Sequence, residues 1–242
     1  MATHVPRLFI NHQLGIGNNL TLPEKTAHHI QHVRRAKLGD PLVLFNGTGG
    51  EYLSSITSIR RSKVEVDIVS YDPVNRESSL TIMLGIGILK REAMNNAVEK
   101  AIELGVTSIV PVETDSTSVT RTHFGKRRDN WLQVIQSACE QSGRTLLPTL
   151  HEVLSFNQWL DFADGDLKLL ASPLTGNGLK CIESTPQSVC VLIGPEGGIS
   201  KNEEQRALDA GFVLVSMGRR ILRAETAPAA LVAIMQYRWG DF

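Results

Sequence analysis

The residue run best suited to chemistry in this 242-residue chain is Gly194–Gly198, which reads Gly-Pro-Glu-Gly-Gly. It follows the apolar run Val189–Ile193 and precedes a helix start signal at Ser200. Three glycines in five residues allow the backbone to approach a ligand closely, and the proline stiffens the loop. The run therefore predicts a ligand-binding loop between a strand and a helix, with a plain tight turn as the alternative.

Two further segments carry groups that can bind a ligand or catalyse a reaction. Ser216–Thr226 places three arginines and a glutamate around an apolar Ile-Leu pair, an unusual composition for a simple connection. Ser172–Gly178 contains Pro173 and two glycines. Each segment follows a predicted strand, and ligands of open α/β sheets bind beyond the carboxyl ends of the strands. These strand ends are where we expect the chemistry.

Several other kinds of chemistry are not indicated. The run Gly85–Gly87 lacks the third glycine of a dinucleotide-binding fingerprint, because position 90 is Lys. His28 and His32 are spaced one helical turn apart, but without a third ligand a surface or RNA-facing pair is favoured over a metal site. Three cysteines without a C-x-x-C pair argue against a disulfide framework or a metal cluster. The sequence contains no hydrolase triad, P-loop or paired-carboxylate motif.

The three loops belong to a part of the chain in which strands and helices alternate. Apolar runs predict strands at 80–89, 106–112, 167–171, 189–193 and 212–216. Apolar periodicity and capping boxes predict helices at 91–104, around 131–139, from Ser155, from Ser200 to Gly211 and at 226–239. This alternation predicts a parallel sheet covered by helices on both faces.

Residues 1–72 show short strands and tight turns instead. Strands are predicted at 7–10, 41–45, 52–59 and 64–69, with a hairpin signal at 46–50. Thr21 and Glu24 have capping-box spacing, with Pro23 in the first turn, and predict a helix that runs to about Arg35. We therefore expect a small β-barrel domain at 1–72, a linker near 71–79, and an α/β domain at 73–242.

Composition and charge limit the class of protein and its partners. Hydrophobic residues make up 42% and charged residues 21%, as in globular proteins, and no bilayer-length apolar run or signal peptide is visible. We therefore expect a cytoplasmic protein. The net charge is zero, yet residues 1–72 carry eight Lys/Arg against six Asp/Glu. Basic clusters, which can bind nucleic-acid phosphates or simply face solvent, occur at 34–37, 60–63, 126–128 and 219–223.

Two long motifs give the chain a resemblance to a known family. Residues 193–198 (Ile-Gly-Pro-Glu-Gly-Gly) and 217–228 (Met-Gly-Arg-Arg-Ile-Leu-Arg-Ala-Glu-Thr-Ala-Pro) resemble the RsmE family of ribosomal RNA methyltransferases. Stretches at 32–40, 100–106 and 140–144 agree, so the resemblance covers nearly the whole chain. The chain departs from the family pattern at Met217, where leucine is usual, and around Val33–Lys37, which is less apolar than usual and bears on RNA contacts expected there.

The resemblance implies a fold and an activity. The fold is an N-terminal PUA-like β-barrel followed by a SPOUT α/β domain with a C-terminal trefoil knot. The activity is that of a homodimer that transfers a methyl group from S-adenosylmethionine, without a metal, to N3 of one uridine in bacterial 16S rRNA (the m3U1498 site). The products are the methylated rRNA, within an assembled small ribosomal subunit, and S-adenosylhomocysteine.

The resemblance also assigns roles to residues by position. Cofactor binding is expected at Ser172, Leu174, Ile193, Gly194, Gly197, Gly198, Met217, Ile221 and Leu222. Uridine N3 carries a proton, so a base or a cation that stabilises the uracil anion aids its methylation. The candidate bases are Glu196 and Glu225, and the candidate anion holders are Arg223 and Arg144. A helix cap is the alternative role of Glu225. RNA binding is expected at Arg7, Arg34, Arg35, Arg60, Arg61, Lys63 and Arg219.

Three other functions stay open on the sequence. The chain could be an RNA-binding assembly factor without catalysis, which the cofactor-type loops disfavour. It could be an α/β enzyme with a nicotinamide cofactor, which the missing glycine at position 90 disfavours. Among methyltransferases, a tRNA or a ribose 2′-hydroxyl is the alternative target.

Overall fold

The computed structural model describes residues 5–61, 63–118, 124–173 and 177–242. Contacts between residues divide the chain into two compact units, each described separately below. Unit 1 comprises Met1–Glu77 together with Cys139–Leu147, and unit 2 comprises Ser78–Ala138 together with Pro148–Phe242. The return of Cys139–Leu147 to unit 1 was not expected from the sequence. The functional division of the chain after residue 72 stays a prediction.

Unit 1 is built on a five-stranded sheet with the strand order β1-β3-β4-β5-β2. The strands are β1 (Arg7–Phe9), β2 (Asn19–Thr21), β3 (Pro41–Phe45), β4 (Glu51–Arg60) and β5 (Lys63–Asp72). The β1–β3 pair is parallel and the other pairs are antiparallel. Alternate residues of β5, namely Val64, Val66 and Ile68, are buried in the apolar core of the unit. This period-two pattern is that of a strand with one face turned to a core.

The first helix is shorter than predicted, and the prediction of a capping box at its start is wrong. Thr21 belongs to β2, where it pairs with Glu65, so it cannot begin the helix. Helix α1 (Glu24–His28) starts after Pro23 without a side-chain cap and continues as a π-helical turn, η1 (His29–Val33). Arg35, where the helix was expected to end, has a left-handed backbone with φ of 53°.

Unit 2 contains an eight-stranded sheet in which every strand pair is parallel. The order is β11-β13-β10-β12-β6-β7-β8, and β9 also pairs with β7. The strands are β6 (Thr81–Gly87), β7 (Ser108–Glu113), β8 (Thr149–Leu150), β9 (Leu154–Ser155), β10 (Leu167–Ala171), β11 (Asn177–Gly178), β12 (Ser188–Ile193) and β13 (Val213–Ser216). The predicted α/β architecture with a parallel sheet is confirmed. The trefoil knot stays a prediction.

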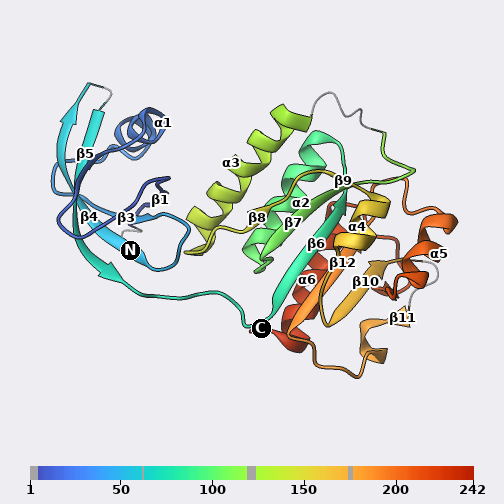
Figure 1. The fold of residues 1–242 in the computed structure, drawn as a ribbon. Coiled ribbons are helices and arrows are strands. Elements are labelled where there is room, and N and C mark those ends of the chain that lie inside the picture. Colours follow the sequence, from blue (N-terminus) through green and yellow to red (C-terminus); the bar gives the residue numbers. More distant parts are fainter. Residues whose placement is uncertain (1–4, 62, 119–123, 174–176) are drawn as a thin grey trace. The chain divides into compact units, whose positions relative to one another are not determined.

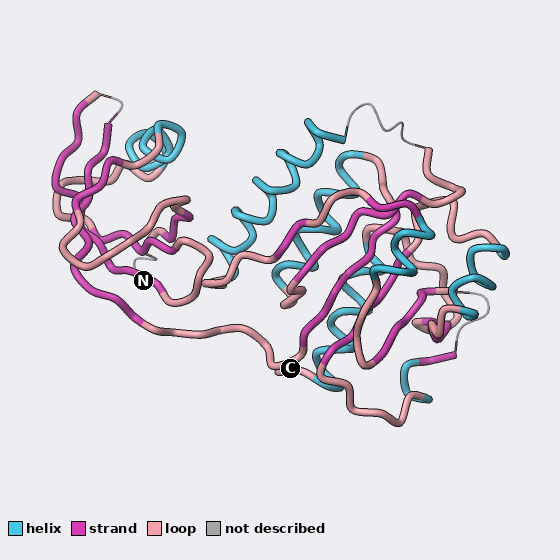
Figure 2. The backbone as a smooth tube through the Cα atoms, in the orientation of Figure 1, coloured by secondary structure: helices cyan, strands magenta, loops and turns pink. Residues whose placement is uncertain are grey.

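Helices cover the faces of this sheet (Figure 1, Figure 2). They are α2 (Arg91–Glu103), α3 (Phe124–Ser142), α4 (Phe156–Phe162), α5 (Lys201–Asp209) and α6 (Thr226–Trp239), with a 3₁₀ turn at Leu179–Cys181. Helices α2 and α6 pack against each other behind the sheet in Figure 1, and α4 lies in front of it. Trp159 of α4 and Ala207 of α5 share one buried cluster with β12 side chains. The predicted capping boxes at Ser155 and Ser200 are confirmed.

A helix that spans a membrane must be long and apolar, and none of the helices formed by the described residues meets both conditions.

Candidate active site

A pocket of about 1010 Å³ lies in unit 2 at the carboxyl ends of four neighbouring strands. In sheet order these strands are β13, β10, β12 and β6. Because parallel strands end at the same edge of a sheet, the segments that follow them meet there. The pocket is lined by parts of Ala171–Pro173, Ile193–Ile199 and Val215–Ala227, and by Lys90 after β6.

The residues expected to bind a cofactor come together in this pocket. Leu174 lies outside the described residues. All of the others line the pocket, namely Ser172, Ile193, Gly194, Gly197, Gly198, Met217, Ile221 and Leu222. The three catalytic candidates of the same segments, Glu196, Arg223 and Glu225, line it as well.

The loop Gly194–Gly198 takes its shape from close packing on β6. A Cβ atom on Gly87 would lie 2.4 Å from the Pro195 ring and 2.5 Å from its nitrogen, so only glycine allows the loop to cross the end of this strand. Gly198 has φ of +75°, a left-handed conformation that side chains disfavour. The glycines therefore give this part of the pocket wall a backbone surface, as expected from the sequence.

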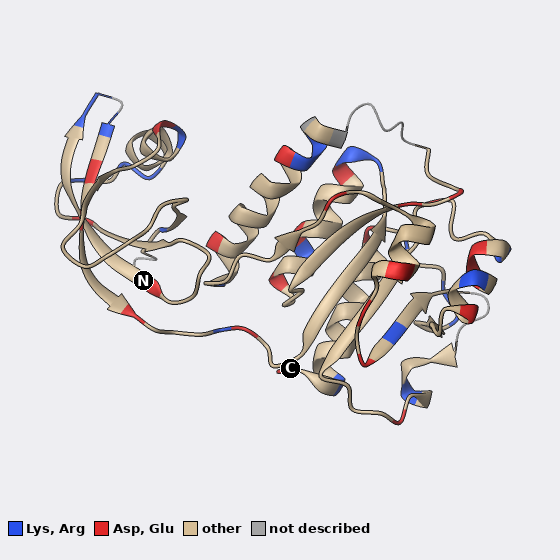
Figure 3. Ribbon diagram, viewed as in Figure 1, with Lys and Arg blue, Asp and Glu red and all other residues tan. Residues whose placement is uncertain are grey.

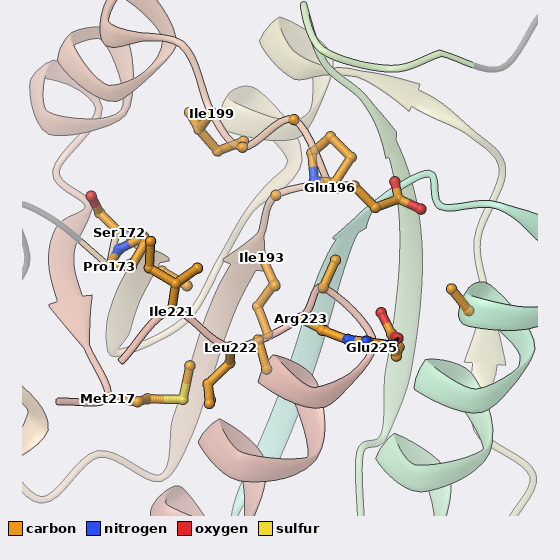
Figure 4. A pocket seen from close by; sticks show the side chains of 18 of the residues that line it. Ser172, Pro173, Ile193, Glu196, Ile199, Met217, Ile221, Leu222, Arg223 and Glu225 are labelled. Carbon is orange, nitrogen blue, oxygen red and sulfur yellow. Dashed lines mark ion pairs between the residues drawn. The ribbon is translucent and has the colours of Figure 1, made fainter. Parts of the chain in front are cut away.

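The pocket has an apolar side and a charged side (Figure 4). Pro173, Met217, Ile221 and Leu222 lie on one side, with Ile193 in the middle. Glu196, Arg223 and Glu225 lie on the other. An apolar cavity with a few polar groups at one side is typical of a small-molecule binding site.

The charged side contains an ion pair of the kind expected at a reacting centre. Arg223 Nη1 lies 3.8 Å from Glu225 Oε1, and the two side chains are 85% and 27% exposed. Glu225 directly precedes α6, but its side chain makes no capping hydrogen bond. The helix-cap alternative for Glu225 therefore has no hydrogen bond to support it, whereas its position in the pocket agrees with a role toward a ligand.

Five charged or polar residues of the pocket were not singled out in the sequence. They are Lys90, Glu92, Asn96, Lys201 and Glu204. Ser172 Oγ, which is buried, donates a hydrogen bond of 2.6 Å to Glu204 Oε1. Most of the five lie just before or in the first turns of α2 and α5, the helices that follow β6 and β12. The strand-end rule that located the loops also applies to these first turns, so this signal could have found them.

Arg144 and Arg7 are in a different environment from the one expected. Arg144, a catalytic candidate, does not line the pocket but belongs to unit 1, where its guanidinium group binds Glu77 through Nε at 3.0 Å and Nη2 at 2.5 Å. Arg7, an RNA-binding candidate, pairs with Glu51 at 2.9 Å and donates to the Cys139 carbonyl oxygen. Both side chains are at most 10% exposed, so both hold unit 1 together.

The other RNA-binding candidates of unit 1 are exposed and lie on two neighbouring elements. Figure 3 marks the Lys and Arg positions of the ribbon in blue. Arg60, Arg61 and Lys63 lie at the turn between β4 and β5, and Arg34 and Arg35 follow η1. Gln31 Nε2 of η1 donates to the Lys63 carbonyl oxygen at 3.3 Å, which joins the two elements. We call these five residues the basic face of unit 1. Arg219 is exposed in unit 2 and lines a smaller pocket with Ile234.

Thiolate and metal chemistry have little support among the described residues. Burial raises the pKa of Cys139 to about 11 and the pKa of Cys190 to about 12, so neither thiol ionises near neutral pH. His28 and His32 have ring centroids 4.5 Å apart. No group of three or more His, Cys, Asp or Glu side chains in the described ranges is placed to hold a metal ion.

The left-handed backbone at Gly198 gives a first prediction. In Gly198→Val, the present loop shape would cost about 1–2 kcal/mol, which corresponds to a loss of about five- to thirtyfold in ligand affinity. Gly211→Val is the matched control, because Gly211 has φ of +83° and does not line the pocket. Calorimetric titration with S-adenosylmethionine should show the loss in Gly198→Val only, with similar thermal destabilisation in both variants. Equal affinities would remove this loop from the site.

Comparison with protein families gives two matches along the chain. Residues 76–236 match the RNA methyltransferase domain family, and residues 22–69 match the RNA methyltransferase PUA domain family. A ribosomal RNA small subunit methyltransferase E of Buchnera aphidicola subsp. Schizaphis graminum is 32% identical, and the match covers 100% of this chain and 99% of that protein. The protein of the same name from Bacillus subtilis is 28% identical, over 87% of each chain.

Two solved structures are similar to this chain over 99% of its length and 100% of theirs. One is a ribosomal RNA small subunit methyltransferase E from Neisseria gonorrhoeae bound to S-adenosylmethionine, with 35% identity and a TM-score of 0.92. The other is a Legionella pneumophila protein described as a methyltransferase, in complex with the same cofactor, with 34% identity and a TM-score of 0.95.

Proposed function

Because the chain belongs to the ribosomal RNA small subunit methyltransferase E family, we propose that it methylates N3 of one uridine in 16S rRNA, the m3U1498 site. It is an S-adenosylmethionine-dependent methyltransferase of small-subunit ribosomal RNA. The observation that carries the proposal is the pocket itself, in which the described parts of three sequence-predicted loops meet.

The pocket fits the cofactor in size and chemistry. Its volume of about 1010 Å³ lies at the upper end of the range of small-ligand pockets, about 300–1,000 Å³, and is compatible with a cofactor and a target base bound together. Ile193, Met217 and Leu222 offer apolar contacts to the adenine ring, and the Gly194–Gly198 backbone offers amide and carbonyl groups. When bound, the cofactor supplies a methyl group already activated on a sulfonium. The task of the chain is therefore to orient and deprotonate the acceptor.

The charged side of the pocket provides the groups for that task. Uridine N3 becomes nucleophilic only as its proton leaves, so a carboxylate within reach of N3 accelerates the reaction. Glu225 and Glu196 are two carboxylates on this side, and Arg223 is a cation that can stabilise negative charge on the uracil oxygens. Glu225 is also paired with Arg223, so base and cation are held together.

A base role for Glu225 predicts a pH-dependent defect in Glu225→Gln. The single-turnover rate at neutral pH should fall about tenfold rather than more, because Glu196 is a second carboxylate near the same place. The rate should recover as the pH approaches the pKa of uridine N3, where solvent removes the proton. A cap role predicts instead a lower melting temperature and a normal rate at every pH.

RNA binding is proposed for the basic face of unit 1. The support is the exposure of all five side chains on two joined elements and the match of residues 22–69 to a PUA domain family. Lysine and arginine side chains bind phosphates and release counterions, so such binding weakens with salt. Arg7 has its guanidinium group engaged inside unit 1 and is not included in this proposal.

Charge reversal of the β4–β5 turn tests this surface. Replacing Arg60, Arg61 and Lys63 by Glu should weaken RNA binding and make it less dependent on salt. The negative slope of log affinity against log salt should become smaller in magnitude by about 2 to 3, since each phosphate contact contributes roughly 0.7–0.9. Affinity for S-adenosylmethionine should not change, because these residues do not line the pocket. An unaltered salt slope would mean that the β4–β5 turn does not bind RNA and simply faces solvent.

A cytoplasmic homodimer is also proposed. Support comes from α6, where Ala229, Ala230 and Ala233 permit close helix approach. On the same helix Ile234 and Tyr237 are 39% and 79% exposed in the single chain. A second copy of the chain would cover such apolar side chains.

Nucleoside analysis of the reaction product tests the proposed function. The purified chain is incubated with S-adenosylmethionine and, separately, with small ribosomal subunits, free 16S rRNA and bulk tRNA. We expect N3-methyluridine only in the 16S rRNA samples, and more of it in assembled subunits. A methylated tRNA base or a 2′-O-methyl nucleoside would support the alternative targets, and binding of RNA without methylation would support a non-catalytic assembly factor.

A further inference from the structure

One wall of the pocket has no role in the activity described so far. It is formed by the residue before α2 and by one face of that helix, where residues three or four apart lie side by side. The lining residues of this α2 wall are Lys90, Glu92, Ala93 and Asn96. The opposite face of the helix is buried and carries only packing residues, namely Met94, Ala97, Val98, Ala101 and Ile102.

Two polar side chains of the α2 wall are available to a ligand. Lys90 and Asn96 are exposed, and neither the Lys90 ammonium group nor the Asn96 amide bonds to another described residue. The neighbouring Asn95 differs, because its Oδ1 accepts a hydrogen bond of 2.7 Å from Asn130. One asparagine of the pair thus has a structural partner, and the other faces the pocket.

The α2 wall borders the charged side of the pocket. The Lys90 backbone amide donates to Glu196 Oε1 at 3.3 Å, so a candidate base is held beside Lys90. Figure 4 shows Glu196 on the same side as Glu225 and opposite Met217 and Ile221. The other charged residues that line this pocket are Glu92 on α2, Glu196 after β12, Lys201 and Glu204 on α5, and Arg220, Arg223 and Glu225 before α6.

We propose that the α2 wall is the subsite for the target uracil, in which Lys90 binds O4 and Asn96 orients the ring. This inference rests on the proposed N3 methylation. Lys90 is the ammonium-bearing residue of the α2 wall. An adenine ring bound against Met217 and Ile221 would leave the α2 side of the pocket for the uracil ring. The positive charge of Lys90 then lies where negative charge develops on the base.

The proton and electron balance of the step is as follows. The N3–H bond breaks and its proton passes to a pocket carboxylate, which leaves a negative charge shared by N3, O2 and O4. The N3 lone pair forms the new bond to the methyl carbon as the carbon–sulfur bond breaks, and its electron pair stays on sulfur. The charge on uracil and the charge on sulfur both disappear. Lys90 stabilises the uracil ring only while the ring carries this negative charge. Its loss should therefore lower the rate of methyl transfer.

Lys90 also provides a reason for the choice of base. An ammonium group has three donors and no acceptor, so it binds the O4 carbonyl of uracil. Cytosine carries an amino group at the same position, which is itself a donor and is repelled. The Asn96 amide can donate to a carbonyl or accept from a ring donor, so it orients either ring and selects less strongly.

The test uses a target RNA in which the methylated uridine is replaced by 5-fluorouridine, whose N3 proton is more acidic. On the uridine RNA, Lys90→Met should lower the single-turnover rate about tenfold or more, and Lys90→Arg should retain part of the rate. On the 5-fluorouridine RNA the deficit should shrink, because less stabilisation of the anion is needed. Arg91→Met and Asn95→Ala are the controls, since neither residue lines the pocket.

A second readout does not depend on methyl transfer. The fluorine NMR shift of the bound 5-fluorouridine RNA, followed against pH without cofactor, reports ionisation of N3. Wild-type protein should move this transition to lower pH than Lys90→Met does. The inference is overturned if Lys90→Met lowers the methylation rate equally on both RNAs and leaves the pH of the N3 ionisation unchanged. If wild-type protein forms neither N3-methyluridine on the uridine RNA nor N3-methyl-5-fluorouridine on the fluorinated RNA, the proposed function fails instead.

Discussion

Arg223→Ala should lower the single-turnover methylation rate about a hundredfold while affinity for S-adenosylmethionine changes little. Removing one preorganised charge at a developing anion costs on the order of a hundred- to a thousandfold. The lower value applies here, because the Arg223 side chain is 85% exposed in the single chain and bound RNA must exclude water from it. Rates measured with saturating cofactor and RNA isolate this effect from binding.

Arg223→Lys provides the matched variant. A lysine keeps the charge but not the planar pair of donors, so it should recover only part of the rate. Arg220→Ala is a control within the same loop that also lines the pocket. Among the described residues the ion-pair partner of Glu225 is Arg223 and not Arg220, so the loss of Arg220 should affect binding rather than the transfer step. A wild-type rate in Arg223→Ala would remove this residue from the chemistry.

The second large effect is expected on stability, in Arg144→Met. Arg144 and Glu77 form a buried, two-pronged ion pair whose side chains are 6% and 10% exposed. Breaking such a pair leaves an uncompensated buried carboxylate and typically costs about 3–5 kcal/mol in the free energy of unfolding. Urea denaturation at neutral pH measures this loss. The double variant Arg144→Met with Glu77→Leu should recover much of it, because an apolar pair of similar size leaves no charge buried.

The same variant decides between the two roles of Arg144. A structural role predicts unchanged affinity for S-adenosylmethionine, because Arg144 does not line the pocket, and a near-normal rate at temperatures where the protein stays folded. A rate defect that persists in the stable double variant would restore the catalytic role expected from the sequence.

The parts of the site that were predicted from the sequence follow from one rule. Gly194–Gly198 and Ser216–Thr226 follow apolar strands of a parallel sheet, and the ends of such strands meet. Their glycines and charges then indicate a ligand without any knowledge of the packing. The first turns of α2 and α5 obey the same rule, but their residues look like ordinary helix surface until the pocket is seen.

The parts that were missed depend on contacts between distant residues. Arg144 and Arg7 look like exposed arginines in the sequence, and only the carboxylates of Glu77 and Glu51 explain their burial. The two-residue strands β8, β9 and β11 are too short to show a period of two. Thr21 and Glu24 have capping-box spacing but form no capping box, because Thr21 pairs with β5 as part of the sheet.

Mass mapping of 16S rRNA from a strain that lacks the gene for this chain tests the central claim most directly. We predict that one uridine loses an N3-methyl group in that strain. Wild-type protein should restore the methyl group, and Arg223→Ala should restore little of it. An unchanged 16S rRNA map, or the loss of a methyl group from a tRNA or a ribose instead, would contradict the proposed function.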